Sequence, residues 1–178
     1  PLNTDLLIVV DVQNDFCPSG TLAVPEGNEV VPVINRLATK FDHVTLTQDW
    51  HPAGHSSFAS AHPGKRPFET INLSYDDQVL WPDHCVQGTP GAAFHSDLDI
   101  PKAEMVLRKG FRSEVDSYSG FYENNRTTST GLAGFVHERG FSRIVLVGLA
   151  LDSARELLRE GLMVKNNAAF LIKFQPKA

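Results

Sequence analysis

The stretch Asp5-Leu6-Leu7-Ile8-Val9-Val10-Asp11-Val12, residues 5–12, decides the fold. It is a continuous apolar run, whereas a strand that is buried on only one face alternates apolar and polar residues. A continuous run of this kind is typical of a strand that is covered on both faces in a parallel sheet. The run therefore predicts a central strand of such a sheet, and Asp11 places a carboxylate near its end.

Further apolar segments predict three more strands and two helices. We expect strands at 43–47, 103–110 and 142–150, a helix at about 29–40 with Asn28 as its N-cap, and a helix at 130–139 stopped by Gly140. A strand–helix–strand order implies right-handed crossovers into a parallel sheet. The sequence thus predicts a single α/β domain over residues 1–178, with three α-β-α layers and a mainly parallel, Rossmann-like sheet. The long segments 52–98 and 111–128 are expected to be loops, and loops of that length are usually functional.

Length, charge and cysteine content restrict the class of protein. The chain has 178 residues, enough for one domain with its own core, and a net charge of −5 with acids and bases interspersed. Since there is no basic patch, we expect a small-molecule partner and no nucleic acid. No apolar run is long enough to span a bilayer, and the first residues do not resemble a signal peptide. Two cysteines outside any C-x-x-C pattern fit a reducing compartment, so the expected location is cytoplasmic, without a membrane partner.

An acid and two imidazoles, Asp49, His51 and His55, follow the predicted strand 43–47. Side chains two residues apart at the end of an extended segment point the same way, so Asp49 and His51 could bind one ion. A carboxylate with imidazoles suits Zn, Fe or Mn better than Ca or Mg. The alternative is that Asp49 caps a turn and His51 lies on the surface.

Polar residues stand at the ends of all four predicted strands: Asp11, Asp49 with His51, Lys109, and the segment 148–152. The carboxyl ends of parallel strands lie along one edge of the sheet, and ligands of open α/β sheets bind in the crevice there. The sequence therefore predicts one site at this edge.

Six blocks of sequence, in this order, resemble the nicotinamidase/pyrazinamidase group of the isochorismatase-like cysteine hydrolases. They cover residues 6–152 and are Val10-Asp11-Val12-Gln13-Asn14-Asp15-Phe16, Gln48-Asp49-Trp50-His51-Pro52, Trp81-Pro82-Asp83-His84-Cys85-Val86-Gln87-Gly88, Arg108-Lys109-Gly110, Asp116-Ser117-Tyr118-Ser119-Gly120-Phe121 and Val147-Gly148-Leu149-Ala150-Leu151-Asp152. The resemblance implies an isochorismatase-like hydrolase domain. It also implies the deamidation of nicotinamide, and of pyrazinamide, to the acid and ammonia in NAD salvage, through a thioester on a cysteine.

The resemblance implies catalytic roles for two side chains and one backbone amide. Asp11 would take the proton of the thiol, and Lys109 would hold this acid and balance charge beside it, since a carboxylate can act as base and a nearby ammonium favours the thiolate. The N–H of Ala150, after a cis Leu149–Ala150 peptide, would bind the developing oxyanion.

The resemblance also implies one divalent metal ion, Zn in first place, with Fe or Mn as alternatives. Asp49, His51 and His84 would bind it, with His55 or Ser57 as a further direct or water-mediated ligand. The ion would hold the pyridine nitrogen of the substrate, as an orienting template. In the alternative, His84 is an ordinary loop histidine.

Three aromatic residues, Phe16, Trp81 and Tyr118, match positions that wall the ring in this family, which suits a flat heteroaromatic substrate. In the alternative, Trp81 and Tyr118 are core aromatics. A homo-oligomer is compatible with the resemblance.

The sequence departs from the family where the nucleophile is expected. The family pattern is Asp-x-Cys, and the residues here are Asp152-Ser153-Ala154, so the side chain at 154 has no atom that can attack a carbonyl. Two explanations stay open. Either the protein lacks its nucleophile, or the sequence omits an internal segment and the tail, which leaves the C-terminal part shortened or incompletely recorded. Cys17 and Cys85 are expected to be small buried or loop residues.

Two other functions stay open beside nicotinamide hydrolysis. A catalytically dead relative would bind nicotinamide-like rings on its metal without cleaving them. An amidohydrolase of the same superfamily would act on another substrate. Isochorismatases proper do not carry the metal set that residues 49–51 and 84–85 resemble, so these residues favour nicotinamide or pyrazinamide.

Overall fold

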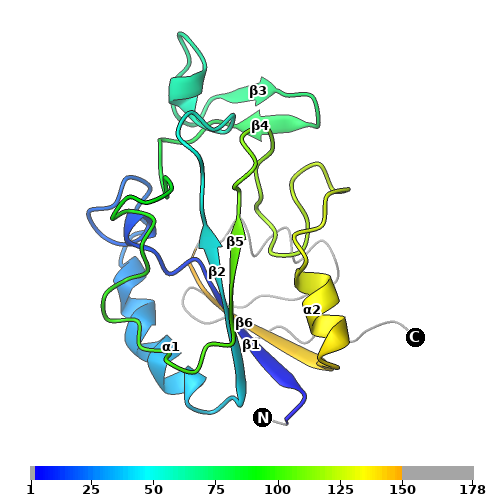
Figure 1. The fold of residues 1–178 in the computed structure, drawn as a ribbon. Coiled ribbons are helices and arrows are strands. Elements are labelled where there is room, and N and C mark those ends of the chain that lie inside the picture. The colour runs from blue at the N-terminus through cyan, green and yellow to red at the C-terminus, as the bar shows by residue number, and fades with distance from the viewer. Residues whose placement is uncertain (1–2, 150–178) are drawn as a thin grey trace.

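Residues 3–149 are described in the structure, which is a computed structural model. They form a parallel sheet in the order β5-β2-β1-β6 (Figure 1). Its strands are β1 (Asp5–Val10), β2 (His43–Asp49), β5 (Met105–Lys109) and β6 (Arg143–Gly148). The predicted parallel sheet is confirmed. The first strand ends at Val10, because Asp11 has a positive φ of 50° that an extended strand does not allow.

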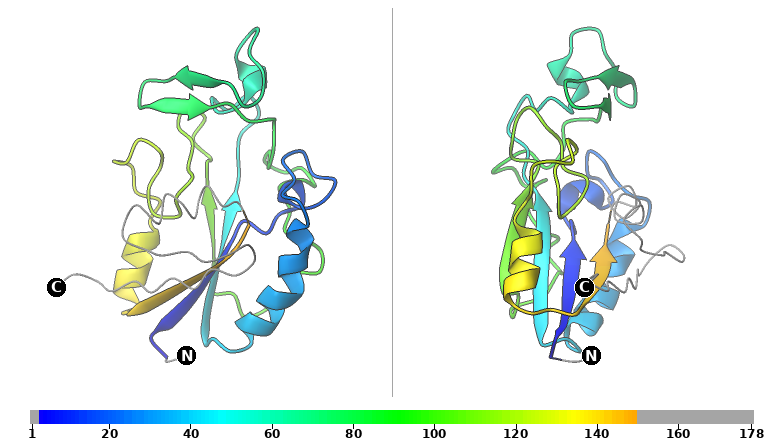
Figure 2. Two further views of the ribbon diagram at one scale, coloured as in Figure 1. Left: turned by 180° about the vertical axis from the view of Figure 1, so that it is seen from behind. Right: turned by 90° about the vertical axis from the view of Figure 1, so that its right-hand side faces the viewer.

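Two helices lie on opposite faces of this sheet, α1 (Val30–Ala38) and α2 (Leu132–Glu138) (Figure 2). Both are shorter than the sequence predicts. A 3-10 turn, η2 (Gly27–Glu29), precedes α1, so the prediction that Asn28 caps this helix is wrong. Asn28 already lies within a helical turn, whereas a capping residue needs an extended backbone.

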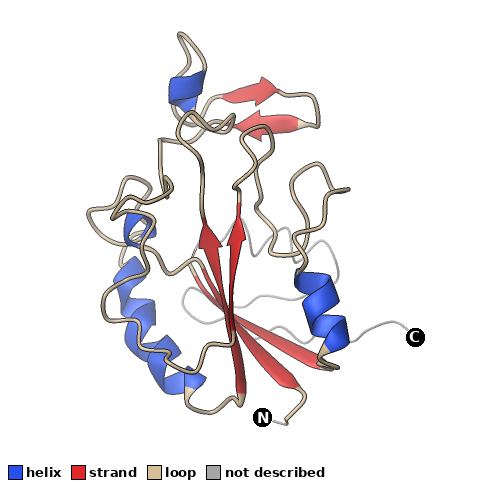
Figure 3. Ribbon diagram, viewed as in Figure 1, coloured by secondary structure: helices blue, strands red, loops and turns tan. Residues whose placement is uncertain are grey.

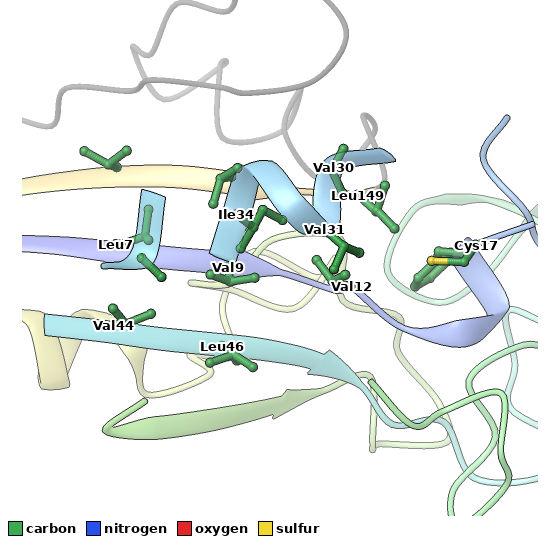
Figure 4. Close-up of a cluster of buried hydrophobic side chains, with 14 of the residues drawn as sticks. Leu7, Val9, Val12, Cys17, Val30, Val31, Ile34, Val44, Leu46 and Leu149 are labelled. Carbon is green, nitrogen blue, oxygen red and sulfur yellow. The ribbon is translucent and has the colours of Figure 1, made fainter. Parts of the chain in front are cut away.

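Successive residues of β1 pack against different helices. One apolar cluster joins alternate residues of β1 to α1: Leu7, Val9, Val31 and Ile34 (Figure 4). The other joins the remaining residues to α2: Leu6, Ile8, Leu132 and Val136. Both faces of β1 are therefore buried, which explains why its sequence is apolar without alternation.

The segment 52–98 contains regular structure that the sequence did not predict. Besides the 3-10 turn η3 (Ala59–Ala61), it forms a small antiparallel hairpin of β3 (Thr70–Asn72) and β4 (Asp77–Val79), which lies beyond the carboxyl ends of β2 and β5 (Figures 1 and 3). A further 3-10 turn, η1 (Asn14–Phe16), follows β1. The hairpin strands have three residues each, of which only Gln78 is buried, so they carry no buried alternation that a sequence pattern could reveal.

Within residues 3–149, none of the helices combines the length and the apolar composition that crossing a bilayer requires. The sequence predictions that concern Ala150 and the segment Asp152-Ser153-Ala154 lie outside the described residues.

Candidate functional site

Three ionisable side chains meet at the carboxyl ends of β1, β2 and β5. Asp49 and Lys109 are paired partners at the ends of neighbouring strands, and their side chains form an ion pair. The Lys109 ammonium also lies 2.8 Å from Oδ2 of Asp11 and donates to the carbonyl of Ser117 at 3.0 Å. Both Asp11 and Lys109 are almost completely buried, at 0% and 1% exposure. We call Asp11, Asp49 and Lys109 the charged centre.

One ammonium balances two carboxylates in the charged centre, and the two carboxylates differ as a result. Burial raises the pKa of Asp11, and the attraction of Lys109 offsets this only in part. Burial also opposes ionisation of Asp49, but there Lys109, followed by His51, holds the pKa below its ordinary value. Burial alone would lower the pKa of Lys109, yet the two carboxylates hold it above its ordinary value. Asp11 is therefore the member of this centre that is suited to accept a proton.

Buried polar contacts fix the two carboxylates in place. The Thr47 hydroxyl donates to Oδ1 of Asp11 at 2.6 Å. The side chain of Gln13 donates to the carbonyl of Asp49 and accepts from its N–H, both at 2.8 Å. Sequence reasoning assigned no role to Gln13. Its burial, which makes these hydrogen bonds necessary, is a property of the tertiary structure that the sequence does not show.

The two histidines of the predicted metal set face the second oxygen of Asp49. Nε2 of His51 lies 3.8 Å from Oδ2 of Asp49, and Nε2 of His84 lies 4.0 Å from the same atom. All three residues are buried, so the alternative in which His51 lies on the surface is wrong. This group, Asp49, His51 and His84, is one that could hold a metal ion.

The other ring nitrogen of each histidine is engaged. Nδ1 of His51 donates to the carbonyl of Gly110 at 2.9 Å, and Nδ1 of His84 donates to that of Pro82 at 2.8 Å. A histidine whose Nδ1–H binds a carbonyl presents an Nε2 lone pair, as metal-binding histidines do. Gly110 is required here, because its φ is +65° and an added Cβ would lie 2.4 Å from the ring of His51. The donor set, two imidazoles and a carboxylate, fits Zn, Fe or Mn.

His55 is placed differently from the other two histidines. Its Nδ1 accepts from the N–H of Ser57 at 3.1 Å and lies 2.7 Å from the Ser57 hydroxyl, while its Nε2 donates to the carbonyl of Arg112 at 2.8 Å. It forms a second group that could hold a metal ion, with His51 and Asp116. Since both ring nitrogens of His55 already have protein partners, an ion would have to displace one of them.

The three predicted ring-binding aromatics lie beside this region. The Phe16 ring packs 5.6 Å from the ring of His84. The indole of Trp81 donates to the Tyr118 hydroxyl at 3.0 Å, and the two rings are 6.2 Å apart. Phe16 is buried, whereas Trp81 and Tyr118 are partly exposed, so these two are not core aromatics.

Neither cysteine in residues 3–149 suits a nucleophile. Cys17 and Cys85 are free and buried. Burial raises the pKa of both thiols, and the negative charge of Asp49 raises that of Cys85 further. A thiol that stays protonated attacks poorly. The two residues are therefore small buried side chains, as the sequence predicted.

The fold and the site together define the class of protein. It is an α/β protein whose parallel sheet carries, at its carboxyl edge, a buried Asp–Lys–Asp group and two free imidazole nitrogens. Proteins of this class can combine proton transfer with a bound metal ion. Comparisons with known proteins identify the family more closely.

The sequence model of the Isochorismatase domain matches residues 5–156. The chain is 56% identical over 150 residues to the nicotinamidase of Acinetobacter baylyi, which covers 84% of this chain and 70% of that protein. It resembles the solved structure of the nicotinamidase/pyrazinamidase of Acinetobacter baumanii, with a TM-score of 0.86, 52% identity, and coverage of 90% of this chain and 80% of that one. It also resembles the pyrazinamidase of Pyrococcus horikoshii in complex with zinc, with a TM-score of 0.67, 32% identity, and coverage of 90% and 82%.

The chain belongs to the isochorismatase family, and within it to the nicotinamidase/pyrazinamidase group of amide hydrolases. The predicted three-layer fold and the predicted enzyme class are thereby confirmed.

Proposed function

We propose that the protein hydrolyses nicotinamide, and pyrazinamide, to the corresponding acid and ammonia with the help of one divalent metal ion. The observation that carries the proposal is the position of Asp49 between two sets of groups. Its Oδ1 contacts Lys109 of the charged centre, and its Oδ2 faces Nε2 of His51 and of His84. One carboxylate therefore joins the residues that can move a proton to those that can hold an ion.

Asp11 is the proposed base and Lys109 the residue that holds it. A buried carboxylate with a raised pKa can take a proton from a thiol and deliver it to a departing amine. The ammonium at 2.8 Å keeps this carboxylate oriented and favours a thiolate beside it. We assign the oxyanion-binding N–H to Ala150 from the family pattern alone, because this residue lies outside the described part.

Asp49, His51 and His84 are the proposed ligands of the metal ion, which we take to be Zn, with Fe or Mn as alternatives. When bound, the ion supplies a Lewis-acidic contact that orients the ring nitrogen of the substrate. The zinc in the Pyrococcus horikoshii relative supports this assignment. Phe16, Trp81 and Tyr118 would exclude water from the ring and hold its plane. His55 and Ser57 bind one another, so we assign them to the support of the site.

Besides the N–H of Ala150, residues 3–149 do not supply the nucleophile of this reaction. We propose that the active protein has a cysteine after Asp152, in a segment that the sequence omits. Its sulfur would attack the amide carbon while Asp11 takes the thiol proton. The C–N bond would then break, ammonia would leave with that proton, and water would cleave the thioester to the acid and the free thiol.

An intact-mass measurement tests the missing segment. We expect a mass well above 19.6 kDa. A mass in agreement with that value would show that the chain has no such cysteine, and the change Ala154→Cys would then measure how much of the site survives.

Release of ammonia from nicotinamide tests the activity itself. We expect turnover that thiol alkylation abolishes and that Asp11→Asn lowers at least about 100-fold, since the loss of a general base typically has that effect. Asp97→Asn, in an exposed loop, removes the same charge and should leave the rate unchanged. Activity that survives alkylation would contradict the thioester.

The two other functions have less support. The relatives reported above are named as enzymes, so the comparisons do not support a catalytically dead binding protein. Tight binding of nicotinamide without turnover would nevertheless restore this alternative. The names of the relatives also favour nicotinamide and pyrazinamide over another amide. The small-molecule substrate, a homo-oligomer and a cytoplasmic location complete the proposal.

A further inference from the structure

Asp116 is a buried acidic residue beside the proposed metal ligands, and the proposed reaction gives it no role. Its side chain is 4% exposed, and its Oδ1 lies 3.9 Å from Nε2 of His51, almost as close as Oδ2 of Asp49. Within residues 3–149, no Lys or Arg nitrogen lies within 4 Å of its carboxylate. A buried carboxylate without a cation is costly, so this position calls for positive charge nearby.

The carboxylate of Asp116 is held in one orientation by two donors. Its Oδ1 accepts from the N–H of Ser117 at 2.8 Å, and its Oδ2 accepts from the side chain of Gln78 at 3.3 Å. The carbonyl of Ser117 in turn accepts from Lys109. Asp116 is therefore tied to the charged centre through its neighbour in the chain.

Gln78 is the residue that links this loop to the hairpin. It is 1% exposed and lies in β4, and its amide also donates to the Tyr118 hydroxyl at 2.7 Å. Its carbonyl oxygen accepts from Tyr75 at 2.8 Å. Through Gln78, the hairpin, which lies beyond the sheet in Figure 1, thus contacts both Tyr118 and the acid that faces His51.

Asp116 cannot replace a member of the predicted ligand set. Asp49, His51 and His84 offer ligand atoms that all lie within 4.8 Å of one another, and Asp116 forms such a group only with His51 and His55. The 3.9 Å between Nε2 of His51 and Oδ1 of Asp116 is too long for a direct hydrogen bond, so Asp116 can contact an ion on this nitrogen through a water molecule.

We infer that Asp116 is a positioning residue of the metal site, which accepts a hydrogen bond from water on the ion that Asp49, His51 and His84 hold. The inference rests on the metal site of the proposed function and adds a residue to it. Gln78 and the Ser117 N–H would orient Asp116, so that its negative charge adds to the affinity for a divalent cation.

Zinc affinity, measured by competition with a chelator on the metal-stripped full chain, tests this inference. We expect Asp116→Asn to weaken zinc binding about 10-fold, since the loss of such an outer partner typically costs 10- to 100-fold. Asp77→Asn removes the same charge from an exposed position of β4 and should bind zinc like the wild type. Equal affinity of Asp116→Asn and wild type would overturn the inference.

Two further measurements separate this role from a structural one. Without metal, Asp116→Asn should unfold at the same temperature as the wild type or higher, because it removes a buried charge that has no Lys or Arg partner within residues 3–149. A lower temperature with unchanged zinc affinity would show that Asp116 only supports the loop. With Co²⁺ in place of zinc, the variant should keep the visible absorption spectrum of the wild type, because no direct ligand is lost. A changed spectrum would overturn the link through water.

The outcome for the wild type separates this inference from the proposed function. If the wild type binds zinc and Asp116→Asn binds it equally well, only the role of Asp116 is wrong. If the wild type binds no zinc, or if Asp49→Asn binds it as tightly as the wild type, the metal site itself is wrong and Asp116 falls with it.

Discussion

The charged centre and the imidazole side of the site, His51, His84 and Asp116, differ in how they are built and in which groups they bring together. The charged centre lies at the ends of regular strands, and its ammonium is already paired with both carboxylates. The imidazole side lies in loops. Nε2 of His51 lies 3.9 Å from Oδ1 of Asp116, and Nε2 of His51 and of His84 lie 3.8 and 4.0 Å from Oδ2 of Asp49, the carboxylate that both halves share. The charged centre thus contains its own counter-charge, whereas the imidazole side brings together donors of the kind that can hold a metal ion.

Removing the cation of the charged centre should have the largest effect. Lys109→Met leaves Asp11 and Asp49 buried without a counter-charge, and we expect a loss of about 3 to 5 kcal/mol in the free energy of unfolding. Urea unfolding measures it. Lys65→Met, at an exposed lysine, should change the same quantity by less than about 0.5 kcal/mol. Equal effects of the two changes would contradict the idea that this half depends on its own cation.

Supplying a cation to the imidazole side should have the next largest effect. Zinc at about 100 times its dissociation constant should raise the free energy of unfolding by about 2.7 kcal/mol, because an ion that binds only the folded state stabilises it. Thermal unfolding with and without zinc measures the gain. His84→Ala should abolish it, and His137→Ala, on the exposed side of α2, should leave it intact. A gain that persists in His84→Ala would place the ion elsewhere.

The aromatic side of the site should respond more weakly. Tyr118→Phe removes the hydroxyl that accepts from Gln78 and from Trp81, and the loss of a hydrogen bond typically costs about 0.5 to 1.5 kcal/mol. We expect the free energy of unfolding to fall within that range and the KM for nicotinamide to rise more than kcat falls. The matched change Tyr122→Phe, at an exposed tyrosine, should alter neither. A change in kcat alone would argue against a role in holding the ring.

The smallest effect on the free energy of unfolding is expected at an exposed ion pair elsewhere in the chain. This pair serves as a reference for the buried charges. Glu104 contacts His43 and lies 2.8 Å from Arg139. Burial works against its ionisation, but the hydrogen bonds from His43 and Arg139 hold its pKa below the ordinary value of 4.5. Glu104→Gln should therefore cost less than about 1 kcal/mol at neutral pH.

The pH dependence of this effect has a definite sign. Because the pKa of Glu104 is lowered in the folded state, its contribution is present above pH 4.5 and is lost as the pH falls below that value. Urea unfolding of the wild type and of Glu104→Gln should thus converge in acid. Glu138→Gln, at an exposed glutamate of α2, should differ little from the wild type at either pH. Curves that diverge in acid would contradict the assignment.

The elements predicted from the sequence are those that a local pattern of apolar residues marks, and the elements without such a pattern were missed. The strand that ends at Asp49 and the helix that precedes Gly140 are visible because buried apolar residues recur with the period of each element. The hairpin of β3 and β4 is too short and too exposed to show such a period. The cap expected at Asn28 was wrong because the backbone enters a 3-10 turn first, and propensity alone does not decide between the two.

The same holds for the site. Residues that a local sequence pattern marks were predicted, and residues that act through long-range contacts were missed. Asp11 directly follows a recognisable strand, and Asp49 and Lys109 are the last residues of two others, so topology alone brings them to one edge. Gln13 and Gln78 act through hydrogen bonds to residues 36 or more positions away, and no local pattern marks them.

The sequence by itself determined the parallel sheet, the donors at its carboxyl edge and the family to which they belong, since burial pattern and residue chemistry are properties of short segments. Only the tertiary structure decided which nitrogen of each histidine is free, that His55 is already engaged, and that Asp116 faces His51. Those features depend on the paths of long loops. Loops are held by contacts between distant residues rather than by a repeating backbone geometry, so their side chains meet in ways that no periodic pattern records.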